Sequence, residues 1–207
     1  MSRVLVIDAG VGNLGNLVRA LERIGAGAEI TLDPGRVAQG RCLLLPGVGA
    51  FAPPREALRG EMEKALHAAL DQGAYLLGIC VGFQLLFESG EEFREVDGLG
   101  LLPGRVTRLP QGVPVPHIGW NLLHDLAGHP LVEGLADYVY FVHSYAPEGM
   151  PDELCLARCT HGRVFPAVAG KERVMGTQFH PERSGEVGLR LLDNFLRMAH
   201  DGSAAGH

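Results

Sequence analysis

The 207-residue chain lacks any apolar run of the roughly 18 residues that a membrane-spanning helix needs. Its N-terminus, MSRVLVIDAG, enters a strand-like pattern at once, without the apolar region of a secretory signal. Basic residues are not in excess, because the formal net charge is −6. This charge argues against nucleic acid or an anionic membrane as the main partner. We expect a cytoplasmic protein.

Cysteine is scarce, with four residues at positions 42, 80, 155 and 159. In a chain of this size without an export signal, free thiols are a better interpretation than a disulfide framework. Cys155 and Cys159 lie near His161, but a metal site there would need further ligands at the usual spacings, and the sequence offers none. Buried cysteine commonly packs as a small apolar side chain. We therefore expect no metal ion.

A convincing phosphate-binding motif is also missing. Residues 10–15 read GVGNLG and lie between a strand-like and a helix-like segment, as in a weak dinucleotide fingerprint. Their spacing differs from G-x-G-x-x-G, and no acidic partner is placed to support it. We expect no cofactor, and any phosphorylated substrate would bind to another polypeptide.

The first half of the chain alternates strand-like and helix-like segments. Strands are expected at 3–8, 41–46 and 75–79, and helices at 14–24, 54–72 and 81–88, with a last helix at 186–199. Continuous apolar runs such as RCLLLP are typical of strands that are covered on both faces. The alternation predicts an α/β fold with a doubly wound, mostly parallel central sheet and helices on both faces.

The pattern changes after Gly98. Up to about Gln178, short strand-like segments such as DYVYFVHSY and RVFPAVA alternate with turns rich in glycine and proline. We expect added antiparallel strands and hairpins on the sheet. With no internal repeat and no interdomain linker, residues 1–200 are expected to form one domain. The small, polar tail DGSAAGH, residues 201–207, is expected to be disordered.

One cysteine lies where a buried strand gives way to a helix, in the stretch GICVG. The spacing G-x-C-x-G resembles the tight strand-to-helix turn that presents the nucleophile of hydrolases. At this position the helix dipole favours the Cys80 thiolate, and the backbone N–H of Val81 points toward a developing oxyanion. A buried cysteine at an ordinary strand–helix junction is the alternative that this motif alone leaves open.

A histidine and a glutamate in the segment GTQFHPER form the second candidate element. His180 and Glu182 lie two residues apart, so in extended backbone both side chains point to the same side. Pro181 places the pair at the end of a strand, where ligands gather in open α/β sheets. His180 would act as general base and acid for Cys80, and Glu182 would hold its tautomer. Among nine histidines the main competitor is His143, which lacks a carboxylate at spacing two.

Together these motifs resemble a known enzyme family. GICVGFQLLF and QFHPE are similar to the class I (triad) glutamine amidotransferases, over nearly the whole chain. Within that class, the segments VIDAGVGNLGNLVRALERIG, LLPGVGAF, PHIGWN and FVHSY resemble the glutaminase subunits of imidazole glycerol phosphate synthase, which serve histidine biosynthesis. The resemblance implies a flavodoxin-like fold. It also implies that Cys80 attacks the side-chain amide of L-glutamine, while His180 shuttles the proton and Glu182 orients it.

The same resemblance implies six substrate-binding or oxyanion residues: Val48, Gly49, Val81, Gln84, Ser144 and Tyr145. One oxyanion donor would be the N–H of Val81, and the other would come from the loop 47–49. Gln84 lies one helical turn after Cys80 and so faces the same pocket, where it could bond the α-groups of glutamine. The alternative for Gln84 is a polar residue at a crowded turn. The segment 144–145 would meet the α-carboxylate through its backbone.

The resemblance further implies a heterodimer with a cyclase, a (β/α)8 barrel that uses the ammonia to make imidazole glycerol phosphate and AICAR. Asn13, Trp120 and Arg183 are the expected contacts, because their segments lie near the presumed strand ends around Cys80 and because Trp and Arg dominate interface energy. The alternatives are a core tryptophan and a solvated arginine. Arg183 stands where lysine is usual, so the geometry of its contact is open.

Two other functions are also compatible with these residues. One is a glutaminase of the same class that serves a different synthase. The other is a catalytically silent, flavodoxin-like binding or regulatory module.

Overall fold

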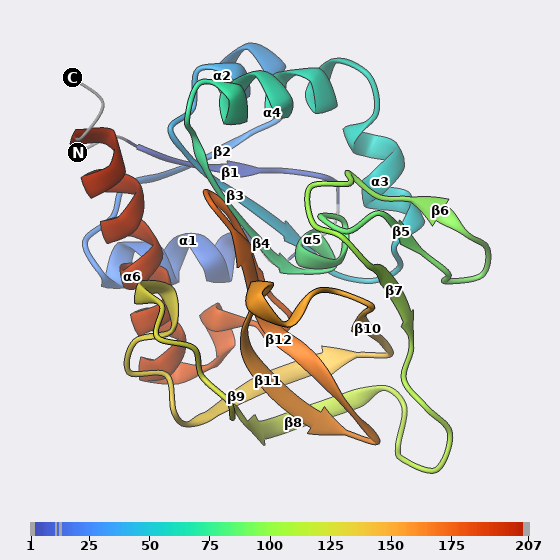
Figure 1. Ribbon diagram of the computed structural model, residues 1–207. Helices are drawn as coiled ribbons and strands as arrows, with labels where there is room; N and C mark the ends of the chain where they lie inside the picture. The colour runs from blue at the N-terminus through green and yellow to red at the C-terminus, as the bar shows by residue number, and fades with distance from the viewer. Residues whose placement is uncertain (1–2, 11, 13, 205–207) are drawn as a thin grey trace.

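The computed structural model describes residues 3–10, 12 and 14–204 (Figure 1). Over these residues a seven-stranded sheet has the order β11-β12-β13-β4-β3-β1-β2. Its parallel strands are β1 (Val4–Ile7), β2 (Ala28–Thr31), β3 (Cys42–Gly47), β4 (Tyr75–Cys80) and β13 (Val174–Thr177). Two antiparallel strands extend one edge: β11 (Cys155–His161) and β12 (Arg163–Lys171).

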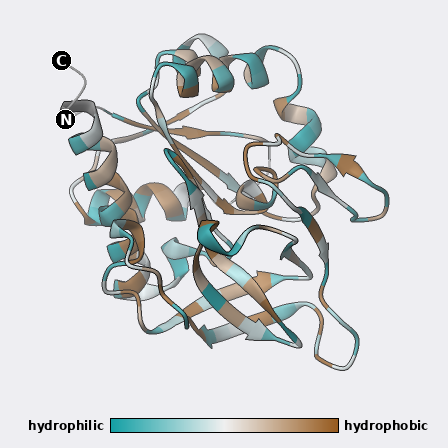
Figure 2. Ribbon diagram, viewed as in Figure 1, coloured by the Kyte–Doolittle hydropathy of each residue, from teal (hydrophilic) through white to brown (hydrophobic). Residues whose placement is uncertain are grey.

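Helices cover both faces of this sheet (Figure 1). One face carries α1 (Leu14–Arg23) and α6 (Gly185–Ala204), and the other carries α2 (Pro34–Ala38) and α4 (Glu61–Asp71). The continuous apolar run of β3 is buried at every position, as expected for a strand covered twice. Figure 2 shows hydrophobic residues along the central strands and polar residues on the outer sides of the helices. The predicted doubly wound, mostly parallel sheet is confirmed.

The helix expected at 81–88 is only the short α5 (Val81–Gln84). The N–H groups of Leu86 and Phe87 donate three residues back, to the carbonyls of Phe83 and Gln84, so the chain continues in turns rather than in an α-helix.

Two other expected helices also have different bounds. The helix expected at 54–72 is two helices, α3 (Ala52–Leu58) and α4, because Gly60 between them has a φ of 80° that no continuing helix permits. The last helix continues to Ala204, so residues 201–204 of the expected disordered tail are helical. An added Cβ on Gly202 would overlap the Tyr75 ring, which shows how closely the helix end packs on β4. Residues 205–207 lie outside the described residues.

The added strands form two further small sheets rather than only an extension of the main one. A four-stranded sheet contains β5 (Ser89–Gly90), β6 (Val96–Asp97), β7 (Arg105–Arg108) and β10 (Tyr145–Glu148), and a two-stranded sheet contains β8 (His117–Leu122) and β9 (Tyr138–His143). Short 3-10 helices lie at η1 (Pro130–Val132), η2 (Asp152–Leu154) and η3 (Pro181–Arg183). No helix in the described part of the chain is long and apolar enough to cross a membrane.

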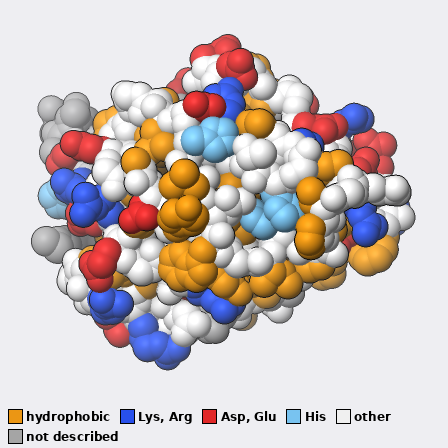
Figure 3. Space-filling model, turned by 90° about the horizontal axis from the view of Figure 1, so that it is seen from below, with side chains coloured by type: hydrophobic (Ala, Val, Ile, Leu, Met, Phe, Trp, Pro, Cys, Tyr) orange, Lys and Arg blue, Asp and Glu red, His pale blue; other side chains and the backbone are white. Residues whose placement is uncertain are grey.

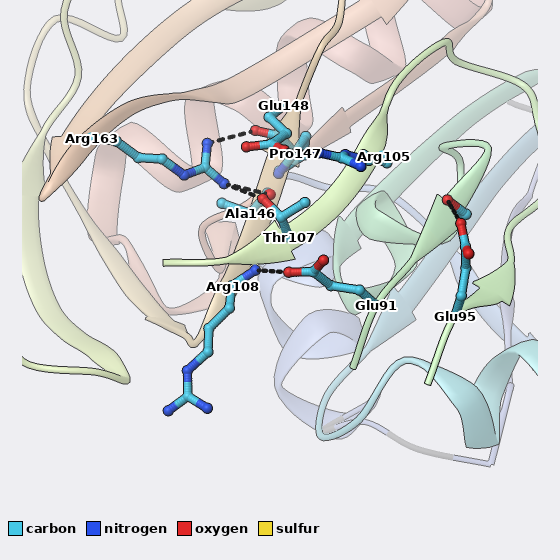
Figure 4. A network of polar contacts seen from close by, with 10 residues as sticks. Glu91, Glu95, Arg105, Thr107, Arg108, Ala146, Pro147, Glu148 and Arg163 are labelled. Atoms are coloured by element: carbon cyan, nitrogen blue, oxygen red, sulfur yellow. Dashed lines mark hydrogen bonds and ion pairs between the residues drawn. The ribbon is translucent and has the colours of Figure 1, made fainter. Parts of the chain in front are cut away.

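One arginine joins the seven-stranded sheet to the four-stranded sheet. The guanidinium of Arg163, on β12, donates to the carbonyl oxygens of Ala146 (2.8 Å) and Pro147 (3.1 Å) and to Oγ1 of Thr107 (3.1 Å) (Figure 4). Strand β10 is therefore held against both β12 and β7. This fixes the start of β10, which borders the site described next.

Candidate active site

Cys80 is the last residue of β4 and begins the tight turn into the short helix α5 (Val81–Gln84). Its backbone has φ 54° and ψ −108°, a conformation that is strained for a residue with a side chain. The flanking glycines do not relieve this strain; they are needed for close packing. A Cβ on Gly82 would overlap the carbonyl oxygen of Leu45. A Cβ on Gly78 would lie 2.7 Å from the carbonyl oxygen of Gly82. The glycines therefore allow the turn to pack closely onto β3. The strained backbone conformation itself is at Cys80.

His180 and Glu182 lie just after β13, the strand beside β4. Nδ1 of His180 donates to Oε1 of Glu182 at 2.8 Å, and both side chains are buried. The backbone N–H of His180 donates to the Tyr140 carbonyl at 3.0 Å, and its carbonyl accepts from Oγ of Ser184 at 2.6 Å. Within the described residues, Nε2 of His180 has no hydrogen-bond partner. The ring therefore has one nitrogen held by the carboxylate and one available for chemistry.

Electrostatics tie His180 to the thiol. Burial lowers the pKa of His180, but the charges of Cys80 and Glu182 outweigh it and raise the pKa to about 10. A histidine cation between a carboxylate and a sulfur is the arrangement found where a cysteine nucleophile is paired with histidine. The three predicted triad residues are therefore together in the structure.

Beside the triad is a cavity of about 220 Å³ at the carboxyl ends of β3 and β4. Its lining includes all six residues expected at the substrate or the oxyanion: Val48, Gly49, Val81, Gln84, Ser144 and Tyr145. Cys80 and His180 also line it. Strand ends that are distant in sequence thus form one site of amino-acid size, at the sheet edge where ligands bind in α/β folds.

Gln178 is a site residue that the sequence analysis missed. Its side chain is fully buried, and its Nε2 lies 3.8 Å from the Cys80 sulfur. Its Oε1 accepts from Nε2 of Gln84 at 3.1 Å, while the same Nε2 also donates to the Tyr145 carbonyl at 2.8 Å. The amide nitrogen of Gln84 is therefore used within the protein, and its Oε1 is the atom that can face a ligand. The sequence did carry a signal for Gln178: it lies two residues before His180, and in extended backbone side chains two residues apart point to the same side.

Glu92 is a second missed residue. Its carboxylate lines the cavity, where Oε2 accepts from the backbone N–H of Phe51 at 2.8 Å. It lies in a loop with several other glutamates, so the sequence carried no signal that singled it out. A carboxylate at this position suits the ammonium group of an amino acid.

His143, the main competitor for the base, has both ring nitrogens in hydrogen bonds. Nδ1 donates to the Tyr145 carbonyl at 2.8 Å, and Nε2 lies 3.0 Å from Nδ1 of His117. Burial lowers the pKa of His143 to about 3, with the neighbouring histidines adding to the effect. A buried imidazole with no nitrogen left over does not accept a proton from Cys80, so His180 is the better base.

Two expected partner contacts, Trp120 and Arg183, lie next to the same ring, that of Tyr140. Trp120 is 56% exposed, which rules out the core tryptophan. The Arg183 guanidinium lies 4.3 Å from the centre of the Tyr140 ring, and that ring is 6.0 Å from Trp120, so the arginine is not merely solvated. Asn13 lies outside the described residues.

Comparison with known proteins agrees with this geometry. The family model for class I glutamine amidotransferases matches residues 5–199. The chain belongs to the class I glutamine amidotransferases. It is 45% identical over 204 residues to the imidazole glycerol phosphate synthase subunit HisH of Symbiobacterium thermophilum, covering 97% of this chain and 96% of that protein. It is 44% identical over 203 residues to the HisH subunit of Salinibacter ruber, covering 93% of each.

A crystal structure of a glutamine amidotransferase has the same fold, with a TM-score of 0.76, 24% sequence identity and coverage of 95% of this chain and 98% of that one. The predictions of an enzyme, of a class I glutamine amidotransferase and of a resemblance to HisH are confirmed. The role of each individual site residue stays a prediction that the geometry supports.

The charge on His180 gives a pH test. We expect the ring to remain protonated between about pH 7 and 9, because its pKa is near 10 rather than 6.5. The stability that the protonated ring adds to the folded state is then fully present below pH 6.5, and it is lost as the pH rises toward 10. Ring ¹⁵N chemical shifts measure this protonation. Cys80→Ala should lower the pKa, whereas Cys159→Ala, away from the cavity, should not. A neutral His180 in the wild type at pH 7 would contradict the ion pair.

Proposed function

We propose that the chain hydrolyses L-glutamine to glutamate and ammonia through a thioester on Cys80. The ammonia passes to a cyclase subunit, a (β/α)8 barrel, that makes imidazole glycerol phosphate and AICAR in histidine biosynthesis. The observation that carries the hydrolysis is the free Nε2 of His180, which lies with Cys80 at one cavity while Glu182 holds Nδ1. The HisH relatives support the choice of synthase. The four free thiols suit the reducing cytoplasm.

The chemistry follows from the triad. The Cys80 sulfur attacks the amide carbon, and the C=O electron pair moves to oxygen. The N–H of Val81 and one from the loop 47–49 stabilise this oxyanion, each donor contributing about 3 kcal/mol to the transition state. His180 gives its proton to the leaving nitrogen, so that ammonia departs and the thioester forms. His180 then takes a proton from water, which attacks the thioester and releases glutamate and the thiolate.

The remaining lining residues suit the backbone end of glutamine. The Glu92 carboxylate and Oε1 of Gln84 are acceptors for the α-ammonium group. The backbone of Ser144 and Tyr145 meets the α-carboxylate. Together they fix the substrate with its amide carbon at the Cys80 sulfur, which is the positioning that attack requires.

The proposed docking surface for the cyclase is the outer face of the β8–β9 pair. The alternation of β8 turns His117 and Asn121 inward and leaves the next residues outward. The surface consists of four exposed hydrophobic side chains: Ile118, Trp120, Leu122 and Tyr138. Figure 3, viewed from below, shows hydrophobic side chains gathered in the middle of this side of the molecule. Exposed patches of this kind mark protein–protein contacts, and Arg183 beside it supplies a charge.

The nucleophile is tested in the assembled synthase. Cys80→Ala should lower glutamine-driven synthesis at least about 10³-fold, because the thioester cannot form. Synthesis from free ammonium should be unchanged, because the acceptor chemistry belongs to the cyclase. Product formation with each nitrogen source is the measurement, and Cys155→Ala, remote from the cavity, is the control that keeps both activities. Loss of the ammonium-driven reaction would show that Cys80 has a structural role instead.

The docking surface is tested with Trp120→Ala. We expect cyclase affinity to fall by about 2 kcal/mol, as for a central aromatic at an interface. Titration calorimetry measures the affinity. Ile30→Ala, an exposed residue on β2 at the other edge of the central sheet, is the matched control and should leave it unchanged. If Trp120→Ala binds as tightly as the wild type and keeps the two reactions coupled, the cyclase docks elsewhere.

A further inference from the structure

A line of hydrogen bonds leads from β8 through His143, which itself lines the cavity, to the Tyr145 carbonyl. Nδ2 of Asn121 lies 3.2 Å from Nε2 of His117, and Nδ1 of His117 lies 3.0 Å from Nε2 of His143. Nδ1 of His143 lies 2.8 Å from the Tyr145 carbonyl oxygen. The two histidines are directly opposite each other in the antiparallel β8–β9 pair, which is why their rings meet.

Backbone groups at the two ends fix the direction of this line. The Tyr145 carbonyl only accepts, so Nδ1 of His143 carries a hydrogen. At the other end, Oδ1 of Asn121 accepts from the next backbone N–H, and its Nδ2 donates to the Thr160 carbonyl at 3.0 Å. The Asn121 amino group therefore also donates to His117. Each imidazole then has one donor and one acceptor nitrogen, and every donor points toward Tyr145.

The surroundings keep both rings neutral and in place. His117 lies between two rings, stacked on His161 at 4.0 Å between centres and on Phe141 at 4.8 Å. His161 is itself held by the Pro114 carbonyl, 2.7 Å from its Nε2. Burial and the neighbouring His161 lower the pKa of His117 to about 4, and burial also lowers that of His143. His117 is stacked on both sides, and His143 packs edge-on or tilted against His117, Phe141 and Phe165. Both neutral rings therefore keep a fixed hydrogen-bond direction and do not take up a proton.

The end of the line is the segment that borders the substrate cavity. The Tyr145 carbonyl receives one N–H from His143 and a second from Gln84. The carbonyls before and after it are also occupied, since Ser144 accepts from the Leu109 N–H at 2.9 Å and Ala146 accepts from the Arg163 guanidinium. At Tyr145 itself, the two side-chain donors hold the carbonyl oxygen, while β7 and Arg163 hold the neighbouring residues.

We propose that His117 and His143 are positioning residues for glutamine, which as neutral imidazoles carry a one-directional hydrogen-bond line from Asn121 to the Tyr145 carbonyl. They thereby set the Ser144–Tyr145 backbone against the substrate. The inference rests on the proposed role of that backbone in holding the α-carboxylate. It gives both histidines a task distinct from the proton transfer of His180.

Two variants of His117 separate the hydrogen bond from the packing. His117→Phe keeps a ring between His161 and Phe141 but removes the donor to His143. His117→Asn removes the ring but places an amide N–H near the Nδ1 position. Glutamine hydrolysis by the full chain with its cyclase is measured for both, together with ring ¹⁵N spectra and thermal unfolding.

For His117→Phe we expect the KM for glutamine to rise about tenfold while kcat falls less than about threefold, because one buried hydrogen bond to a positioning group is lost. His117→Asn should stay within about threefold of the wild type in both constants. In the wild type, ring ¹⁵N shifts at pH 7 should show both histidines as neutral rings with the hydrogen on Nδ1. A purely structural role would lower the unfolding temperature without this KM-against-kcat split.

An unchanged KM in His117→Phe, or a wild-type His143 that is charged or carries its hydrogen on Nε2, overturns the inference. If His117→Phe does not fold, a second experiment tests the inference: glutamine is added to the inactive Cys80→Ala protein, and the His143 ring resonances are measured. The His143 ring resonances should shift on binding, and constant resonances at saturation overturn the inference. Absence of glutamine hydrolysis by the wild type refutes the proposed function instead, and the tautomers then report on the hydrogen-bond line alone.

Discussion

The left-handed backbone of Cys80 is the constraint on which the site depends. A non-glycine residue at φ 54° is strained by roughly 1–3 kcal/mol and persists only where its surroundings fix it. Here the surroundings are close contacts that leave no room for a Cβ, at Gly82 against the Leu45 carbonyl and at Gly176 against the Phe83 ring. Strand β4 therefore ends abruptly, and the thiol lies at the carboxyl edge of the sheet.

Sheet register brings the other groups to that thiol. Ile79 pairs with Thr177 in the parallel β4–β13 pair, so the residues that follow each strand emerge side by side. Cys80, the last residue of β4, directly follows Ile79, and His180 lies three residues after Thr177, the last residue of β13. The two faces of β8 differ, because its inner face carries the histidine line and its outer face is the exposed hydrophobic surface. The alternation of a single strand thus connects the proposed substrate positioning with the proposed docking surface.

Local patterns in the sequence were enough for the parts of the site that depend on short-range geometry. A strand end followed by G-x-C-x-G located Cys80. Spacing two drew attention to His180 and Glu182, although Glu182 lies in the 3-10 helix η3 and not in the expected extended backbone. Contacts between distant segments could not be read in this way. The pairing of His117 with His143 requires the β8–β9 register, and Glu92 reaches the cavity from a loop with no pattern. The edge strand β2 is short and only partly buried, so it gave no periodic signal.

The central claim is that Cys80 is the nucleophile that receives the γ-acyl group of glutamine. An electrophilic glutamine analogue tests it directly, with the modified cysteine located by peptide mass spectrometry. The account predicts labelling of Cys80 alone among the four cysteines, prevention of labelling by glutamine, and strongly reduced labelling in His180→Ala. Labelling of another cysteine, or labelling of Cys80 that glutamine does not prevent, would contradict the account.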